Sequence, residues 1–198
     1  DVVLSNVLVN TTKEAGIYIT RGSSTTDYNS RITVQNALLY NCCTLVGPRG
    51  AFWAEFCNDL TVSNVTTQDN ANGYGFCFLD GNDIDVKGCL AKNPPSRGFG
   101  TDDRTTTNVA ASWIRWTFVN NLVNSNAANE AYYVVPASGK TIDNLLVLGN
   151  NATNVPAGNY IFTNRLAIAA KVGNNTSLEA RSVANVGSGL APTTFNNS

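Results

Sequence analysis

Glu55 is the acidic residue whose place in the sequence is hardest to explain by structure alone. It stands inside the apolar segment Ala51-Phe52-Trp53-Ala54-Glu55-Phe56, which is typical of a strand. Turn formation does not account for a carboxyl group in the middle of a strand. Apolar neighbours favour the protonated form of a carboxyl group, and such a group can donate its proton in general acid catalysis. Glu55 is therefore the leading candidate for acid or base chemistry.

Cleavage of a glycosidic bond needs a second carboxyl group near the first. The two groups lie about 5 Å apart in retaining enzymes and about 6.5–9.5 Å apart in inverting enzymes. Asp80 ends the equivalent strand one repeat later, and Asp102 and Asp103 stand in a long polar loop, so each could be the partner. A solvated-loop role stays open for Asp102 and Asp103. Asp59 and Asp83 follow an Asn just before a strand, which is typical of turns.

Three aromatic residues, Tyr18, Trp53 and Tyr133, are expected to face outward from strands. Their rings could stack on sugars, and the alternative is that they pack chains together in an oligomer. Arg21 and Arg104 could bind an acidic sugar, and the alternative for both is a solvated surface position.

No metal and no cofactor is predicted. The chain contains no His, its five Cys form no CxxC pair, and no Asp, Asn and Gly spacing matches a calcium loop. The cysteines are interpreted as small buried apolar side chains.

A repeated segment must position these residues. It is first seen as Leu4-Ser5-Asn6-Val7-Leu8 and recurs at intervals of 23 to 33 residues. Each copy has an Asn or Gly that tolerates a left-handed backbone, with apolar residues two positions before and mostly two positions after it, which are expected to point inward. The central residues are Asn6, Asn36, Asn64, Gly88, Asn121 and Asn144.

A second strand is expected between these repeats, at residues 16–19, 51–56, 75–78 and 132–135. Ile17, Phe52, Phe76 and Tyr132 would point inward. Residues 93–111 form the largest insertion and are expected to stand out as a loop.

The fixed short core and the variable repeat length predict an all-β fold, a right-handed single-stranded parallel β-helix of about six turns. The solenoid would span residues 1–150. Residues 151–198 would form a last turn and an extended or oligomer-dependent tail, less regular than the rest.

The overall composition excludes several partners. Of 198 residues only 14% are charged and the net charge is −1. No basic patch indicates nucleic acid, and no apolar run approaches the roughly 20 residues of a membrane span.

The repeat and its spacing resemble the pectate-lyase-like β-helix superfamily, above all the β-helix of bacteriophage tailspikes and polysaccharide depolymerases. The resemblance covers about residues 2–150. It implies an extracellular or virion-associated protein with a long polysaccharide ligand and, for tailspikes, a homotrimer. The open strand edge at the N-terminal end would be covered by another chain or by preceding sequence.

Two motifs depart from relatives within that superfamily. Asp102-Asp103 lacks the His that polygalacturonases require, and Tyr74-Gly75-Phe76 lacks the Asp-Pro-His that follows in alginate epimerases. The resemblance to tailspikes therefore implies a glycoside hydrolase or polysaccharide lyase that binds and cleaves a bacterial capsule or O-antigen. The alternatives are a non-catalytic structural or adhesive fibre segment, or a secreted pectin-type enzyme fragment.

Overall fold

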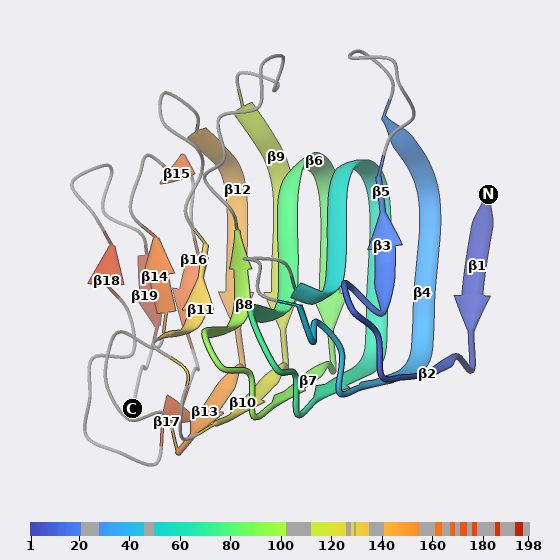
Figure 1. Ribbon diagram of the computed structural model, residues 1–198. Helices are drawn as coiled ribbons and strands as arrows, with labels where there is room; N and C mark the ends of the chain where they lie inside the picture. Colours follow the sequence, from blue (N-terminus) through green and yellow to red (C-terminus); the bar gives the residue numbers. More distant parts are fainter. Residues whose placement is uncertain are drawn as a thin grey trace.

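The described part of the chain is all-β and every strand pairing in it is parallel. The computed structural model describes residues 1–20, 28–45, 50–101, 112–125, 128, 130–134 and 141–154, and the short segments 161–163, 167–168, 171–173, 176–177, 185–186 and 193–195. No helix occurs in these ranges, and hence none that could cross a membrane. Successive turns lie side by side from the N-terminal strand at one end to the C-terminal strands at the other (Figure 1).

The strands form three columns in which each turn pairs with the next. The first column consists of β1 (Val2–Ser5), the middle of β4 (Asn29–Tyr40) and of β5 (Gly50–Gln68), the end of β6 (Tyr74–Lys87), β9 (Ser112–Val119), β12 (Thr141–Leu148), β16 (Lys171–Gly173) and β19 (Thr193–Phe195). The second consists of β2 (Leu8–Asn10), the ends of β4 and β5, β7 (Leu90–Lys92), β10 (Leu122–Asn124), β13 (Asn151–Thr153) and β17 (Thr176–Ser177). The third consists of β3 (Ile17–Ile19), the starts of β5 and β6, β8 (Arg97–Thr101), β11 (Glu130–Tyr133), β14 (Ile161–Thr163) and β18 (Asn185–Val186).

This arrangement confirms an all-β parallel solenoid and is compatible with a β-helix. Beyond residue 154, short strands still pair with the turns before them, among them β15 (Ala167–Ile168) with β12. The division of the chain at residue 150 stays a prediction.

The corner between the first and second columns needs a left-handed residue in each turn. Asn6, Asn36, Asn64 and Gly88 have φ angles of 57°, 53°, 52° and 61°, which confirms the four N-terminal repeats. The last two corner residues were predicted one or more positions away from the true ones. Asn120 and Gly149 occupy the corner, with φ of 54° and 63°, in place of Asn121 and Asn144.

Asn144 belongs to a different corner, the one that precedes the first column. Its φ is 59°, and Arg31, Asp59, Asp83 and Arg115 hold similar left-handed conformations in the other turns. The prediction failed there because Asn is favoured at both corners for the same conformational reason.

The residues two positions after the corner mostly face outward, contrary to the prediction. Leu8 and Leu38 are 71% and 38% exposed, whereas Leu39, Thr67, Ala91 and Val123 are fully buried. A left-handed residue interrupts the alternation of a strand, so the inward parity changes at the corner.

The third column carries a stack of aromatic rings in the core. Phe52, Phe76 and Tyr132 are buried as predicted, and Phe99 lies between the last two. Its ring centroid is 4.5 Å from that of Phe76 and 5.3 Å from that of Tyr132. Strand β8 therefore lies within the segment expected to be a long loop, and it supplies the ring that keeps the stack continuous.

All five cysteines are buried, as interpreted from the sequence, and none of them forms a disulfide. Burial raises the pKa of the Cys57 and Cys89 thiols to about 12. Both thiols are therefore uncharged apolar packing groups at neutral pH.

A line of small residues allows the chain to enter the third column. Gly16, Ala51, Gly75, Gly98 and Ala131 each precede an inward-facing residue of that column. A Cβ atom on Gly98 would overlap the Val123 side chain and lie 2.7 Å from the Ala131 carbonyl oxygen. A Cβ on Gly100 would meet no heavy atom closer than 3.4 Å.

These contacts predict different outcomes for two substitutions in one strand. Gly98→Ala should lower the free energy of unfolding by about 1–3 kcal/mol or more, because the backbone must move to accept the methyl group. Gly100→Ala is the matched control and should change it by less than about 0.5 kcal/mol. Urea denaturation of both variants measures the difference, and equal midpoints would contradict this packing.

Two asparagines form a hydrogen-bonded ladder inside the C-terminal turns. Asn121 and Asn150 are each 1% exposed. Asn121 Oδ1 accepts the Cys89 backbone N–H at 2.9 Å, and its Nδ2 donates to Val86 O at 3.0 Å. Asn150 Oδ1 accepts both the backbone N–H and the Nδ2 of Asn121. The ladder satisfies backbone groups at a corner where earlier turns place Val65 and Ala37.

Asn121→Ala should therefore destabilise the fold by about 2–4 kcal/mol, because the Cys89 N–H and the Val86 carbonyl lose their buried partner. Asn124→Ala, in the adjacent strand and half-buried, should cost less than about 1 kcal/mol. Thermal unfolding followed by circular dichroism compares the two, and an equal loss would show that the ladder contributes no more than a surface amide.

Candidate functional site

The outer surface of the third column brings together the predicted aromatic residues. Tyr18, Trp53, Cys77, Gly100 and Tyr133 pair in register from turn to turn. They differ in exposure, because Tyr18 is 45% exposed, Tyr133 is half-buried, and Trp53 and Cys77 are buried. Tyr18 is the most exposed of the five.

Trp53 does not have the open face expected of a sugar platform. Its side chain is 2% exposed and forms a small second core with Tyr74 and Cys77, against which Ala15 packs. Trp53 was predicted to be accessible on the outer surface, but Tyr74 from the next turn and the segment before β3 cover its side chain.

Arg97 occupies the outer surface between two tyrosines and was not among the predicted residues. Its guanidinium carbon lies 3.5 Å from the ring centroid of Tyr133 and 5.2 Å from that of Tyr74. Arg97 also donates to the Tyr74 hydroxyl at 2.5 Å and to Glu130 Oε2 at 2.8 Å. Burial lowers the Arg97 pKa, but the bond to Glu130 and the nearby charges outweigh this and raise it. The sequence signal was weak because Arg97 begins the strand that follows Pro94-Pro95.

Glu55 lies on the same outer surface and is half-buried. The hydroxyl of Tyr18 donates to Glu55 Oε1, and Thr20 Oγ1 donates to the same oxygen at 2.8 Å. Both donors come from the preceding turn. Among the described residues, no hydrogen bond or ion pair ends at Glu55 Oε2.

Asp80 lies in the turn after Glu55 and is offset by one position. Leu79 is the register partner of Glu55, and Gly81 is the partner of Cys57, so Asp80 stands beside Phe56. The Asp80 side chain is 2% exposed, and the Tyr28 hydroxyl donates to its Oδ2 at 3.0 Å. The two predicted carboxylates therefore come from adjacent turns, each bound by a tyrosine hydroxyl.

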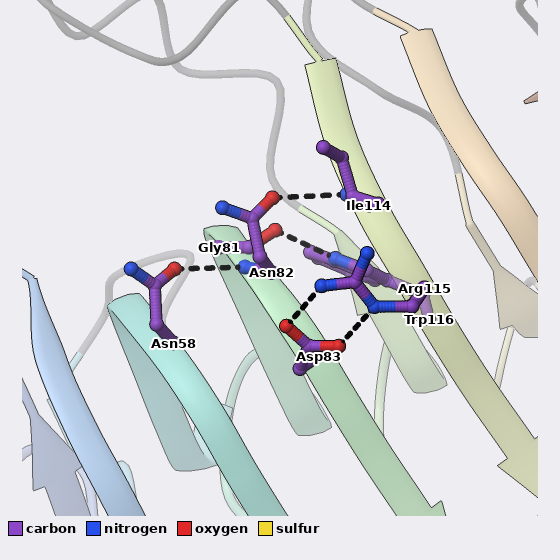
Figure 2. Close-up of polar contacts among 7 residues, drawn as sticks. All are labelled: Asn58, Gly81, Asn82, Asp83, Ile114, Arg115 and Trp116. Carbon is purple, nitrogen blue, oxygen red and sulfur yellow. Dashed lines mark hydrogen bonds and ion pairs between the residues drawn. The ribbon is translucent and has the colours of Figure 1, made fainter.

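The neighbouring corner carries a polar ladder and an ion pair (Figure 2). Asn58 Oδ1 accepts the Asn82 backbone N–H at 3.2 Å, and Asn82 Oδ1 accepts that of Ile114 at 3.1 Å. Asp83 binds Arg115 through both carboxylate oxygens, and this bond raises the Arg115 pKa.

The same corner confirms the turn assignment of two acidic residues. Asp59 and Asp83 both have left-handed backbones, with φ of 60° and 55°. On the inner side of this corner, the buried Trp116 indole N–H donates to Gly81 O at 2.8 Å (Figure 2).

Four predicted site residues, Arg21, Asp102, Asp103 and Arg104, lie outside the described residues. In the ranges that the structure describes, no three His, Cys, Asp or Glu side chains gather as metal ligands.

The arrangement combines features that carbohydrate chemistry uses. An exposed tyrosine, a carboxylate with one oxygen unpartnered among the described residues and a row of amides belong to neighbouring turns, and a second carboxyl group, Asp80, is buried one turn away. No protein-family model matches the chain, and no curated protein or solved structure matches it.

Proposed function

We propose that this protein binds and cleaves a long extracellular polysaccharide, such as a bacterial capsule or O-antigen, on the outer surface of its third column. In this proposal the chain is a right-handed β-helix of about six turns related to phage tailspikes. It acts as a homotrimer on a virion or outside the cell. The all-β parallel solenoid and the outer carboxylate of Glu55 support the proposal.

One observation carries it. Asp83, Asp85 and Glu130 each accept a hydrogen bond from an Arg or Lys. Glu55 is held by two hydroxyl groups instead, and its Oε2 binds no other described residue. A carboxylate that binds no cation among the described residues and lies beside an exposed tyrosine can exchange a proton with a bound sugar.

Asp80 is the proposed second carboxyl group. The step between turns is about 4.8 Å and an offset of one residue adds about 3.3 Å along the strand. The two displacements are at right angles, so the backbone positions lie about 5.8 Å apart. The separation of about 6.5–9.5 Å in inverting glycosidases then requires the two side chains to diverge. The ring of Tyr18 would stack on a sugar, and Asp102 or Asp103 remains the alternative second carboxylate.

A structural or adhesive role is the second candidate, and a different surface favours it. The outer side of the second column exposes Leu8 and Leu38 in neighbouring turns. Apolar surface of this kind suits association between chains and does not require any chemistry.

Glu55→Gln should abolish release of oligosaccharides from a susceptible polysaccharide, with a loss of at least about 100-fold, because the amide cannot exchange a proton in the reaction. The variant should fold and assemble like the wild type, since Gln keeps the shape of Glu. The measurement is reducing-end release from a panel of capsular and O-antigen polysaccharides, with oligomeric state measured in the same samples.

Glu14→Gln is the matched control, because Glu14 is exposed and is not among the residues proposed to bind or cleave the sugar. It should retain wild-type cleavage. A well-assembled wild type that cleaves nothing in the panel would leave the structural role as the better explanation.

A further inference from the structure

We infer that Tyr18 and Thr20 are positioning residues that hold Glu55 Oε1, so that Oε2 is the reacting oxygen and Glu55 is the basic member of the carboxyl pair. The inference rests on the proposed function. It assigns Glu55 the opposite role to the general acid that its apolar sequence neighbours indicated.

The register between β3 and β5 places the hydroxyl groups of Tyr18 and Thr20 beside Glu55. Ile17 pairs with Phe52, and Ile19 pairs with Ala54, and all four side chains point into the core. Because side chains alternate along a strand, Tyr18 points outward, and Thr20 follows Ile19 beside Glu55. Neither donor is close to Glu55 in the sequence, since they are 37 and 35 residues away.

The hydrogen bonds use Glu55 Oε1 as an acceptor and leave Oε2 without a partner among the described residues. An ionised carboxylate only accepts hydrogen bonds, and here two hydroxyl groups donate to one of its oxygens. Bonds from hydroxyl donors to an ionised carboxylate are among the stronger hydrogen bonds in proteins. Fixing Oε1 also fixes the direction of the open lone pairs on Oε2.

The proton transfers balance with Asp80 as the acid. A water oxygen bonds to the anomeric carbon while the glycosidic carbon–oxygen bond breaks. Glu55 Oε2 takes one proton from that water, and the protonated Asp80 carboxyl group gives its proton to the leaving oxygen. Tyr18 and Thr20 touch neither reacting atom and affect the proton transfer through Glu55.

Two conservative substitutions test the positioning role in the full-length chain. Tyr18→Phe keeps the ring, and Thr20→Val keeps the side-chain shape, so each removes one hydrogen bond. Each should lower kcat about ten-fold, and both together more, with KM changed less than about two-fold. Tyr40→Phe, another exposed tyrosine on a different column, should match the wild type. A role of Tyr18 in stacking alone predicts an unchanged kcat in Tyr18→Phe, and that result would overturn the inference.

A second readout does not depend on cleavage. Three-bond couplings of the Glu55 side-chain protons, measured by NMR on labelled protein, report whether it occupies one rotamer. The wild type should show one rotamer, and Tyr18→Phe/Thr20→Val should show averaging. If the wild type shows one Glu55 rotamer but cleaves no polysaccharide, the proposed function is rejected, and with it the effect of Tyr18 and Thr20 on catalysis. Their hydrogen bonds to Glu55 would still stand. Wild-type couplings that the double variant leaves unchanged would reject the contact itself.

Discussion

Hydrogen bonding between successive turns is the constraint on which the rest of this structure depends. Each strand pairs in parallel with the equivalent strand of the next turn, so every turn must bend at the same places. A bend that continues the ladder requires a left-handed residue. This explains why Asn or Gly occupies the corner between the first and second columns, as Asn36, Asn64 and Gly88 do in successive turns. The same stacking brings like residues together inside, as the rings of Phe76, Phe99 and Tyr132 show.

Stacking also decides which outer side chains can meet. Residues in register lie one strand spacing apart, within reach of long polar side chains. Where a cation faces a carboxylate, the result is an ion pair, as between Arg97 and Glu130 or between Asp83 and Arg115. Where hydroxyl groups face it, as at Glu55, one carboxylate oxygen accepts both hydrogen bonds and the other binds no described residue. The candidate site therefore arises from the same geometry as the ion pairs and differs only in the facing residues.

The sequence predicted the phase of the first four repeats because each has one Asn or Gly flanked by aliphatic residues. It failed at Asn120-Asn121, where two candidates are adjacent, and at Asn144, which serves a different corner. Strand β8 was missed because Arg97-Gly98-Phe99-Gly100 is short and rich in Gly. Glu55 was recognisable as an acid inside a strand, but its partners Tyr18 and Thr20 were not, because their contact depends on a register that local patterns do not determine. The burial of Trp53 likewise depends on Tyr74, which reaches it from another turn.

The position of Glu55 relative to its hydroxyl partners depends in turn on the interior. A slip of one residue between β3 and β5 would exchange inward and outward side chains, so that Ile17 and Ile19 would face water and Tyr18 would enter the core. Gly16 resists such a slip, because its backbone N–H donates to Ala51 O at 2.7 Å and any Cβ there would crowd the Cys42 sulfur. Tight packing at this corner is therefore a condition for the outer site around Glu55. Substitutions that loosen the corner should disturb the site through register before they unfold the chain.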